Sequence, residues 1–253
     1  LETHQYLDYL DDEIENTIKP IINLQSNLSG KKSIFRGLYL GDTFTQDQKN
    51  AISYGTLDNL FLGDYWTMGG INYRIADFNY WNYGLGGMHL VIVPDTCLLT
   101  RQMDLNNNSY YSLLYYHADI RAYLNNIVLP TMIASNFDNC IAQYYENLQS
   151  NTNKFNEVEA RLELMSESMV YGQGILRTDS APTYSINQLA LFKVRPEFIY
   201  CYQNYWLRDR SGINYCMVTE NGMASYASNY DPTVGIRPCF ALAGVPMYTP
   251  PSP

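Results

Sequence analysis

The stretch at 204–240 constrains the fold of this chain more than any other. It begins Asn-Tyr-Trp-Leu-Arg-Asp, continues through an aromatic run punctuated by glycines, and closes with Gly-Ile-Arg-Pro-Cys-Phe. Two polar-aromatic strands therefore bracket a turn-rich segment that ends in a rigid Arg-Pro strand. This pattern predicts irregular loops displayed on a compact frame, and it favours recognition by a binding face over chemistry in a pocket.

Composition supports a large globular domain with an unusual surface. The chain has 253 residues, of which 46% are hydrophobic and only 16% are charged, against roughly 25% in ordinary soluble domains. The 24 tyrosines suit a recognition surface, because tyrosine combines a rigid apolar ring with a polar tip. A net charge of −9 argues against a nucleic-acid partner. No apolar run is long enough to predict membrane insertion.

The cysteines do not predict a metal site or a disulfide framework. Five are scattered along the chain without a CxxC pair or a Cys/His spacing: Cys97, Cys140, Cys201, Cys216 and Cys239. They are interpreted as buried free thiols, which fits assembly in a reducing compartment such as a bacterial cytoplasm. No cofactor and no metal is expected.

The first 32 residues are predicted to form a separate helix. Apolar residues recur at 3,4 spacing over about three heptads, interrupted by the polar Thr17. The seam consists of Leu7, Leu10, Ile14, Ile21, Leu24 and Leu28. One interpretation is an oligomerising stalk, with a trimer favoured; the other is an amphipathic helix packed on its own domain, since Pro20 would kink a stalk. Ser29-Gly30-Lys31-Lys32 is typical of a helix stop and linker, so the main domain is expected at 33–253.

Local signals in the main domain predict an α+β fold. Strands are expected at 33–40, 88–93, 204–209, 213–219, 223–228 and 235–243. Thr45 and Gln48 form a capping box for a helix, and Gly69-Gly70 predicts a tight hairpin turn. Helix is expected over 112–149 with a break near Pro130, and a strand followed by a short helix over 162–172. Asn221-Gly222 predicts a second hairpin turn.

The sequence contains no catalytic motif. The three histidines, His4, His89 and His117, have no partner at metal-ligand spacing and are interpreted as structural or surface residues. Arg208 and Arg237 could each clamp a ligand carboxylate or a sugar, but they are better interpreted as paired arginines that pin loops. No carboxylate pair can be assigned acid and base roles. A non-enzymatic protein is therefore expected.

Several motifs occur in one order along the chain and resemble those of a known domain family. They are Asp119-Ile120-Arg121-Ala122-Tyr123-Leu124-Asn125, then Phe137 and Ile141, Leu164-Met165-Ser166-Glu167, Tyr205-Trp206-Leu207-Arg208 and Gly235-Ile236-Arg237-Pro238. The family resembled is a domain of phage virion and bacterial surface proteins. It is similar to the C-type-lectin-like fold of retroelement-diversified variable proteins and of formylglycine-generating enzymes. Gly63-Asp64-Tyr65-Trp66 and Val91-Ile92-Val93-Pro94-Asp95 resemble the phage versions in particular.

The resemblance implies a C-type-lectin-like domain whose variable face precedes the closing Gly-Ile-Arg-Pro strand, here within 209–234. The candidate ligand-binding residues on that face are Arg210, Asn214, Tyr215, Glu220, Asn221, Met223, Tyr226, Asn229 and Tyr230. The chain lacks the Glu-Pro-Asn, Gln-Pro-Asp and Trp-Asn-Asp motifs of calcium-dependent lectins, so calcium-mediated sugar binding is not expected. Cys201 and Cys216 have no oxidase motif around them.

Three functions are compatible with these patterns. The leading one is a non-enzymatic structural protein of a phage virion, located at the virion surface, that displays a lectin-like domain to recognise a host cell-surface glycan or protein. Its copies would form a homotrimer and contact other virion proteins, and avidity would strengthen weak single contacts. The alternative is a purely architectural decoration, head-fibre or baseplate component. The third is a formylglycine-generating-enzyme-like oxidase using Cys201 or Cys216.

Overall fold

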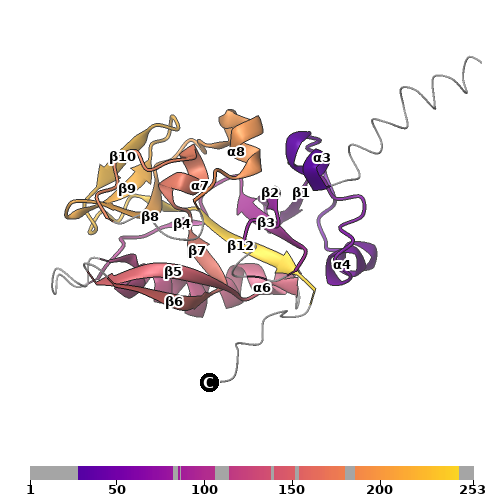
Figure 1. Ribbon diagram of the computed structural model, residues 1–253, viewed down its shortest axis with the longest axis horizontal. Coiled ribbons are helices and arrows are strands. Elements are labelled where there is room, and N and C mark those ends of the chain that lie inside the picture. The colour runs from indigo at the N-terminus through magenta and orange to yellow at the C-terminus, as the bar shows by residue number, and fades with distance from the viewer. Residues whose placement is uncertain are drawn as a thin grey trace, which may run out of the picture.

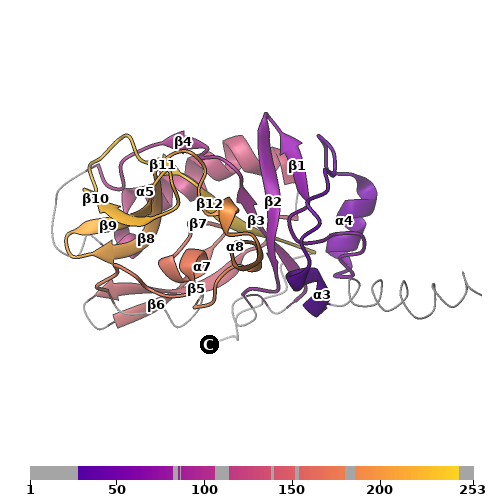
Figure 2. The same cartoon turned by 90° about the horizontal axis from the view of Figure 1, so that it is seen from above.

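The computed structural model describes residues 28–81, 85, 87–105, 114–137, 140–151, 154–179 and 186–244. Within these ranges the chain is α+β, as the sequence predicts, with two five-stranded sheets and a separate two-stranded hairpin. Figures 1 and 2 place α3 (Leu28–Ser33) and α4 (Gln46–Ser53) at one end of the molecule and the β8–β10 strands at the other. No helix in the described ranges is long and apolar enough to cross a membrane.

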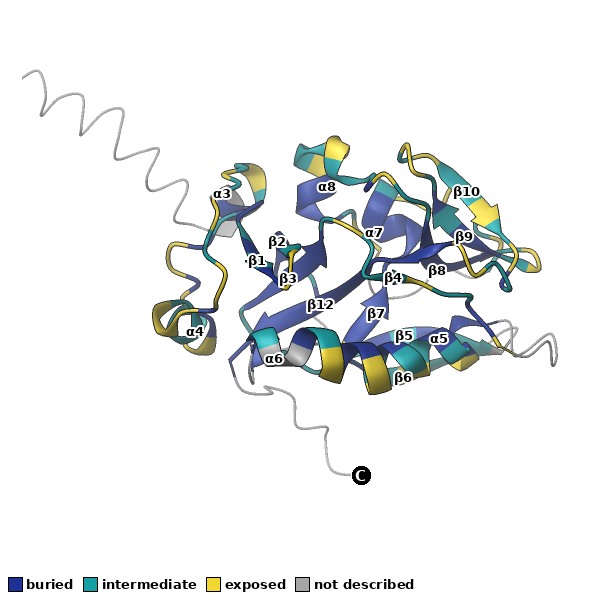
Figure 3. Ribbon diagram, turned by 180° about the vertical axis from the view of Figure 1, so that it is seen from behind, coloured by how far each residue is buried: buried dark blue, intermediate teal, exposed yellow. Residues whose placement is uncertain are grey.

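The first sheet forms the centre of the molecule and is antiparallel throughout. Its strands, in spatial order, are β1 (Tyr65–Met68), β2 (Ile71–Phe78), β3 (His89–Pro94), β12 (Pro238–Ala243) and β7 (Leu162–Leu164). Gly69 and Gly70 join β1 to β2 with φ angles of 59° and 78°, which only glycine adopts readily. This hairpin is confirmed. Every residue of β3 and β12 is buried, as the dark strands in Figure 3 show.

The second sheet carries the 204–240 stretch. Its order is β10 (Ala224–Ala227), β9 (Asn214–Val218), β8 (Tyr205–Ser211), β11 (Gly235–Ile236) and β4 (Leu99–Thr100). All four strands predicted in this part of the sequence are present. The strand predicted at 235–243 is divided at Arg237 into β11, which lies in this sheet, and β12, which lies in the first. That residue is therefore the point at which the two sheets are joined.

The prediction of helix over 112–149 is wrong in its second half. The helical part comprises η2 (Tyr115–His117), α5 (Asp119–Tyr123), the π-helical η3 (Leu124–Ile133), which continues through Pro130, and α6 (Ala134–Phe137). The chain then forms a hairpin of β5 (Tyr144–Asn151) and β6 (Lys154–Ala160), and β5 contacts η2. Tyr144, Glu146 and Leu148 are buried in alternation. A charged residue at a buried position conceals the period of two that identifies a strand.

Short helices cover the sheets. The predicted α4 is confirmed, with both hydrogen bonds of the Thr45–Gln48 capping box. The predicted strand-to-helix unit is also confirmed: β7 leads into α7 (Glu167–Tyr171), which is capped by Ser166 and ends at Gly172 in the left-handed conformation. Two further short helices, α8 (Ala190–Val194) and η5 (Pro196–Phe198), precede β8.

A cluster of aromatic rings fills the core between α6 and the first sheet. The ring of Phe137 contacts the rings of Trp66, Tyr73 and Phe240, with centroids 5.4–5.9 Å apart. Two of these contacts are edge-on, which suits the charge distribution of aromatic rings. Trp206, Tyr205 and Phe240 are fully buried. The core is thus continuous across both sheets.

The segment before β1 differs from its prediction. The 29–32 stretch is helical rather than a linker. It is anchored to the main domain by Lys31, which is buried and donates hydrogen bonds to the carbonyls of Leu57 and Leu60 at 2.6 and 3.0 Å. The expected boundary at 32/33 therefore lies inside α3. The 33–40 strand is reduced to isolated bridges at Phe35 and Tyr39. Of the stalk seam, Leu28 begins α3, and Leu7 to Leu24 lie outside the described residues.

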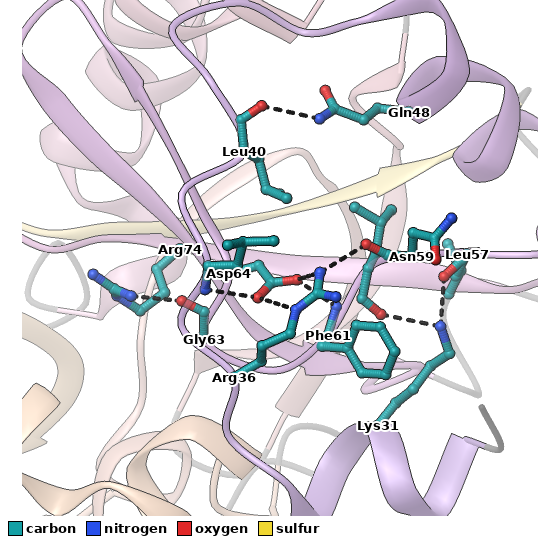
Figure 4. A network of polar contacts seen from close by, with 12 residues as sticks. Lys31, Arg36, Leu40, Gln48, Leu57, Asn59, Phe61, Gly63, Asp64 and Arg74 are labelled. Carbon is teal, nitrogen blue, oxygen red and sulfur yellow. Dashed lines mark hydrogen bonds and ion pairs between the residues drawn. The ribbon is translucent and has the colours of Figure 1, made fainter. Parts of the chain in front are cut away.

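A buried carboxylate holds this irregular segment in place (Figure 4). Asp64 has no exposed surface and receives hydrogen bonds from the Arg36 guanidinium, from Leu38 N at 2.9 Å and from Phe61 N at 2.8 Å. Arg74 donates to the carbonyl of Gly63 and pairs with Asp95. The Gly63-Asp64-Tyr65-Trp66 and Val91-Ile92-Val93-Pro94-Asp95 motifs thus contain buried polar contacts that stabilise the fold.

Candidate binding face

The hairpin turn between β9 and β10 is the most prominent feature of the predicted face. Gly222 N donates to Thr219 O and Thr219 N to Met223 O, both at 2.8 Å. Gly222 has a φ of 82°, so glycine is required where the sequence predicts the turn. The Asn221-Gly222 turn is confirmed.

Neighbouring segments fix this turn from outside the hairpin. The hydroxyl of Tyr171 donates to Gly222 O at 3.1 Å, and Glu220 N donates to Asn204 Oδ1 at 2.8 Å. Tyr200 packs so closely that a Cβ added to Gly222 would lie 3.4 Å from its side chain. Side chains on the turn are therefore presented from a fixed backbone, which limits the entropy lost when they bind a partner.

Six of the nine predicted face residues have solvent-accessible side chains. Glu220, Asn221, Met223 and Tyr226 are exposed, with Met223 at 68% and Tyr226 at 54%, while Asn214 and Tyr230 are partly buried. Parts of β10 and its adjoining loops are coloured as exposed in Figure 3, as are parts of α4 and α8.

Exposure is the wrong expectation for Arg210, Tyr215 and Asn229, all of which are buried. Arg210 donates to Gly212 O at 2.5 Å across the turn between β8 and β9. The Tyr215 ring packs against Trp206. Asn229 O accepts a hydrogen bond from Met103 N at 2.9 Å. These three residues are therefore not part of an exposed face.

Sequence reasoning missed two tyrosines that extend the face. Tyr202 is 84% exposed, and its ring contacts that of Tyr200 with centroids 5.4 Å apart. Because Tyr200 also packs on the Gly222 turn, these tyrosines adjoin the predicted face. The signal in the sequence is the alternation Tyr200-Cys201-Tyr202 directly before β8. We call Tyr200, Tyr202, Glu220, Asn221, Met223 and Tyr226 the display face.

A group of buried charges lies along β8 and at the start of α7. Arg208 pairs with Glu146 at 3.0 Å, which confirms that Arg208 is a paired arginine. The Glu167 carboxylate accepts hydrogen bonds from the backbone N–H groups of Ile175, Leu176 and Arg177 at 2.8–3.1 Å. Burial, together with the negative charge of Asp209, raises the pKa of Asp179 to about 7. These contacts fix loops that the strands do not hold.

Histidine, cysteine and acidic side chains are the ones that could hold a metal ion. The described residues contain no group of three such side chains placed to do so. His89 accepts a hydrogen bond from Trp81 N and is bonded to Gly87 O, and burial lowers its pKa to about 4, so it is structural as expected. His4 lies outside the described residues.

Two hollows are lined by residues outside the display face. One, of about 370 Å³, is lined by Tyr116, His117, Arg121 and Arg161, but Arg121 is bonded to Glu163 and Arg161 to Gln143. The other, of about 750 Å³, is lined by residues that include Lys32, Asp77 and Lys193, and Lys32 pairs with Asp77 at 3.0 Å. The arginines of the first hollow and Lys32 of the second are thus engaged within the protein.

Fold and site together define an α+β domain with a rigid, tyrosine-bearing display face. The sequence profile of a family described as a domain of unknown function, DUF6273, matches residues 94–244, which is more than half of the chain. The chain belongs to this family. No curated protein and no solved structure matches it. The match begins at the last residue of β3 and includes the whole display face, whereas β1 and β2 precede it.

Proposed function

We propose that this protein is a non-enzymatic component of a phage virion, with a C-type-lectin-like fold, that recognises a host cell-surface glycan or protein through its display face. The motifs behind the resemblance support the fold assignment by their positions. Tyr205-Trp206-Leu207-Arg208 begins β8 beneath the face, and Gly235-Ile236-Arg237-Pro238 forms the junction of β11 and β12.

The observation that carries the proposal is the combination of rigidity and exposure in the display face. Tyr202, Met223 and Tyr226 are more than half exposed. Single exposed apolar side chains are common on protein surfaces, but groups of them often mark a binding site. The turn beneath them is fixed by Tyr171, Asn204 and Tyr200. Rigid aromatic side chains of this kind supply much of the binding energy in protein and sugar recognition.

Oligomerisation is the second part of the proposal. The seam of apolar residues from Leu7 to Leu28 would join copies, with a trimer favoured, and would attach them to other virion proteins. Several display faces on one particle would raise the overall affinity well above that of a single face. Sedimentation of the full chain tests this part, because a monomer at micromolar concentration would contradict it.

A binding experiment tests the recognition part. Fluorescently labelled full chain is incubated with a panel of bacterial strains, and bound protein is measured by flow cytometry. Combining Tyr202→Ala with Tyr226→Ala removes two exposed rings, so we expect at least about a tenfold loss of binding to any strain that binds the wild type.

Tyr54→Ala is the matched control. Tyr54 is 78% exposed but caps the end of α4, at the opposite end of the molecule from β10 (Figures 1 and 2). Its loss should leave binding unchanged. Equal losses in both variants, or no binding to any strain, would contradict recognition by the display face. A particle reconstruction with 209–234 at an inter-subunit contact would instead favour the architectural alternative.

A further inference from the structure

Two cysteines far apart in the sequence meet where the two sheets join. Cys97 lies between β3 and β4, and Cys201 lies in the loop before β8. Their Sγ atoms are 3.5 Å apart across a sequence separation of 104 residues. Both are free thiols. The side chains are therefore already in contact before any covalent bond forms.

Arg237 holds the two segments that carry these cysteines. Its buried guanidinium donates from Nε to Pro94 O and from Nη1 to Ile199 O, both at 2.8 Å. Each carbonyl lies within three residues of one cysteine. A single side chain therefore fixes the spacing between the two segments.

Strand β11 adds backbone contacts to the same two segments. Ile236 O accepts from Leu98 N at 2.9 Å, and Gly235 N donates to Asn204 O at 2.8 Å. A Cβ at residue 235 would lie 2.4 Å from Cys97 Sγ, so the glycine leaves the space that this sulfur occupies. The position of Cys97 is thus set by close packing.

The surroundings of the pair favour a thiolate. Hydrogen bonding from Cys97, and after it the positive charge of Arg237, lower the pKa of Cys201 to about 6, and the pKa of Cys97 is raised. Near neutral pH the pair then shares one proton. Cys201 supplies the nucleophilic sulfur, while Cys97 is the more exposed of the two.

We propose that Cys97 and Cys201 form a reversible disulfide when the protein meets a low-molecular-weight disulfide such as oxidised glutathione. The thiolate of Cys201 attacks one sulfur of the oxidant, which breaks its S–S bond and releases one small thiolate. Cys97 then gives its proton to solvent and attacks Sγ of Cys201, releasing the second small thiolate. Two protein thiols lose two electrons, and one small disulfide becomes two thiols.

The cross-link has a structural consequence for the display face. Cys201 lies between Tyr200 and Tyr202, so a bond to Cys97 ties their loop covalently to the end of β3. Thiols would persist during assembly in a reducing compartment and would be oxidised after release from it. The inference rests on the cysteine geometry and stands whether or not the display face binds a partner.

Peptide mapping tests the proposal on the full chain. The protein is equilibrated with oxidised glutathione, its remaining thiols are alkylated in denaturant, and the peptides are analysed without reduction. We expect a peptide linking residues 97 and 201, with Cys140, Cys216 and Cys239 alkylated. Alkylation of both Cys97 and Cys201, or glutathione retained on either residue, would overturn the proposal.

A second measurement uses thermal stability. Closing so long a loop should raise the melting temperature of the oxidised protein by about 5–15 °C over the reduced protein. Cys201→Ser should abolish this difference. Cys140→Ser should retain it, since Cys140 is buried to the same 7% as Cys201 but has no role in the pair. An unchanged difference in Cys201→Ser would contradict the assignment.

Discussion

The two ends of the molecule both hold irregular loops with buried carboxylates, but they neutralise those carboxylates differently. At the α3–α4 end, Asp64 lies against the guanidinium of Arg36, with an ion-pair distance of 2.5 Å. At the β8–β10 end, Asp179 accepts a long hydrogen bond of 3.4 Å from Arg210 N, and it lies near a second carboxylate, Asp209. The paired charge of Asp64 therefore stabilises the folded protein at one end, whereas the charge of Asp179 opposes folding at the other.

This contrast concerns the display face, because Asp179 belongs to the end that presents it. Thr178 N donates to Arg210 O at 2.7 Å, so the segment around Asp179 pairs with the end of β8. A carboxyl group with a raised pKa is commonly found near functional sites. The loops at this end thus sacrifice some stability at neutral pH, while those around Asp64 do not.

The largest effect is expected from Asp64→Asn. The substitution leaves the Arg36 guanidinium without its counter-charge and replaces an acceptor oxygen with an amide that faces N–H donors. We expect a loss of about 3 kcal/mol in the free energy of unfolding, measured by urea denaturation. Asp42→Asn is the control, since Asp42 is exposed and should change stability by less than about 0.5 kcal/mol. A loss below about 1 kcal/mol for Asp64→Asn would remove the contrast between the two ends.

A smaller effect of opposite sign is expected from Asp179→Asn. Because the pKa of Asp179 is about 7 in the folded protein and near 3.8 otherwise, the folded state binds more protons than the unfolded state between these values. Stability contributed by this group is present below about pH 4 and is lost as the pH rises through 7. The variant should therefore be more stable than the wild type at pH 8, by about 2 kcal/mol, and nearly equal to it at pH 4.

Asp231→Asn provides a control of opposite sign. Hydrogen bonds from Thr233 lower the pKa of Asp231, so its contribution is present at neutral pH and is lost as the pH falls. This variant should gain nothing at pH 8. Melting curves over pH 4–8 measure both variants, and a gain at pH 8 in Asp231→Asn alone would contradict the assignment to Asp179.

The sequence predicted correctly those turns and helices that depend only on residues adjacent in the chain. The Gly69-Gly70 and Asn221-Gly222 turns depend on glycine at positive φ, and α4 depends on its capping box, so each follows from a few adjacent residues. The β5 strand did not follow, because Glu146 is buried through contacts with Arg208, 62 residues away, and with Trp81, 65 residues away. A long-range contact of this kind leaves no local trace.

The same distinction applies to the display face. Its turn could be predicted from Asn221-Gly222, and Met223 and Tyr226 proved to be exposed. The burial of Tyr215 depends on packing against Trp206, nine residues earlier on the paired strand β8. The exposure of Tyr202 depends on its left-handed backbone conformation, with a φ of 60°. Neither property follows from residue type.

Tyr202→Asn has the smallest expected effect on stability, and it separates stability from display. A tyrosine at positive φ is strained by about 1 kcal/mol, and asparagine tolerates this conformation better. Since the ring is 84% exposed and loses only its contact with Tyr200, we expect a gain of about 0.5 kcal/mol in urea denaturation. Tyr54→Asn should show no such gain, because Tyr54 has a φ of −87°.

If Tyr202 is retained for recognition, the more stable Tyr202→Asn variant binds bacteria less well. If the Tyr202→Asn variant gained stability and kept full binding, the strained tyrosine would have no role in recognition.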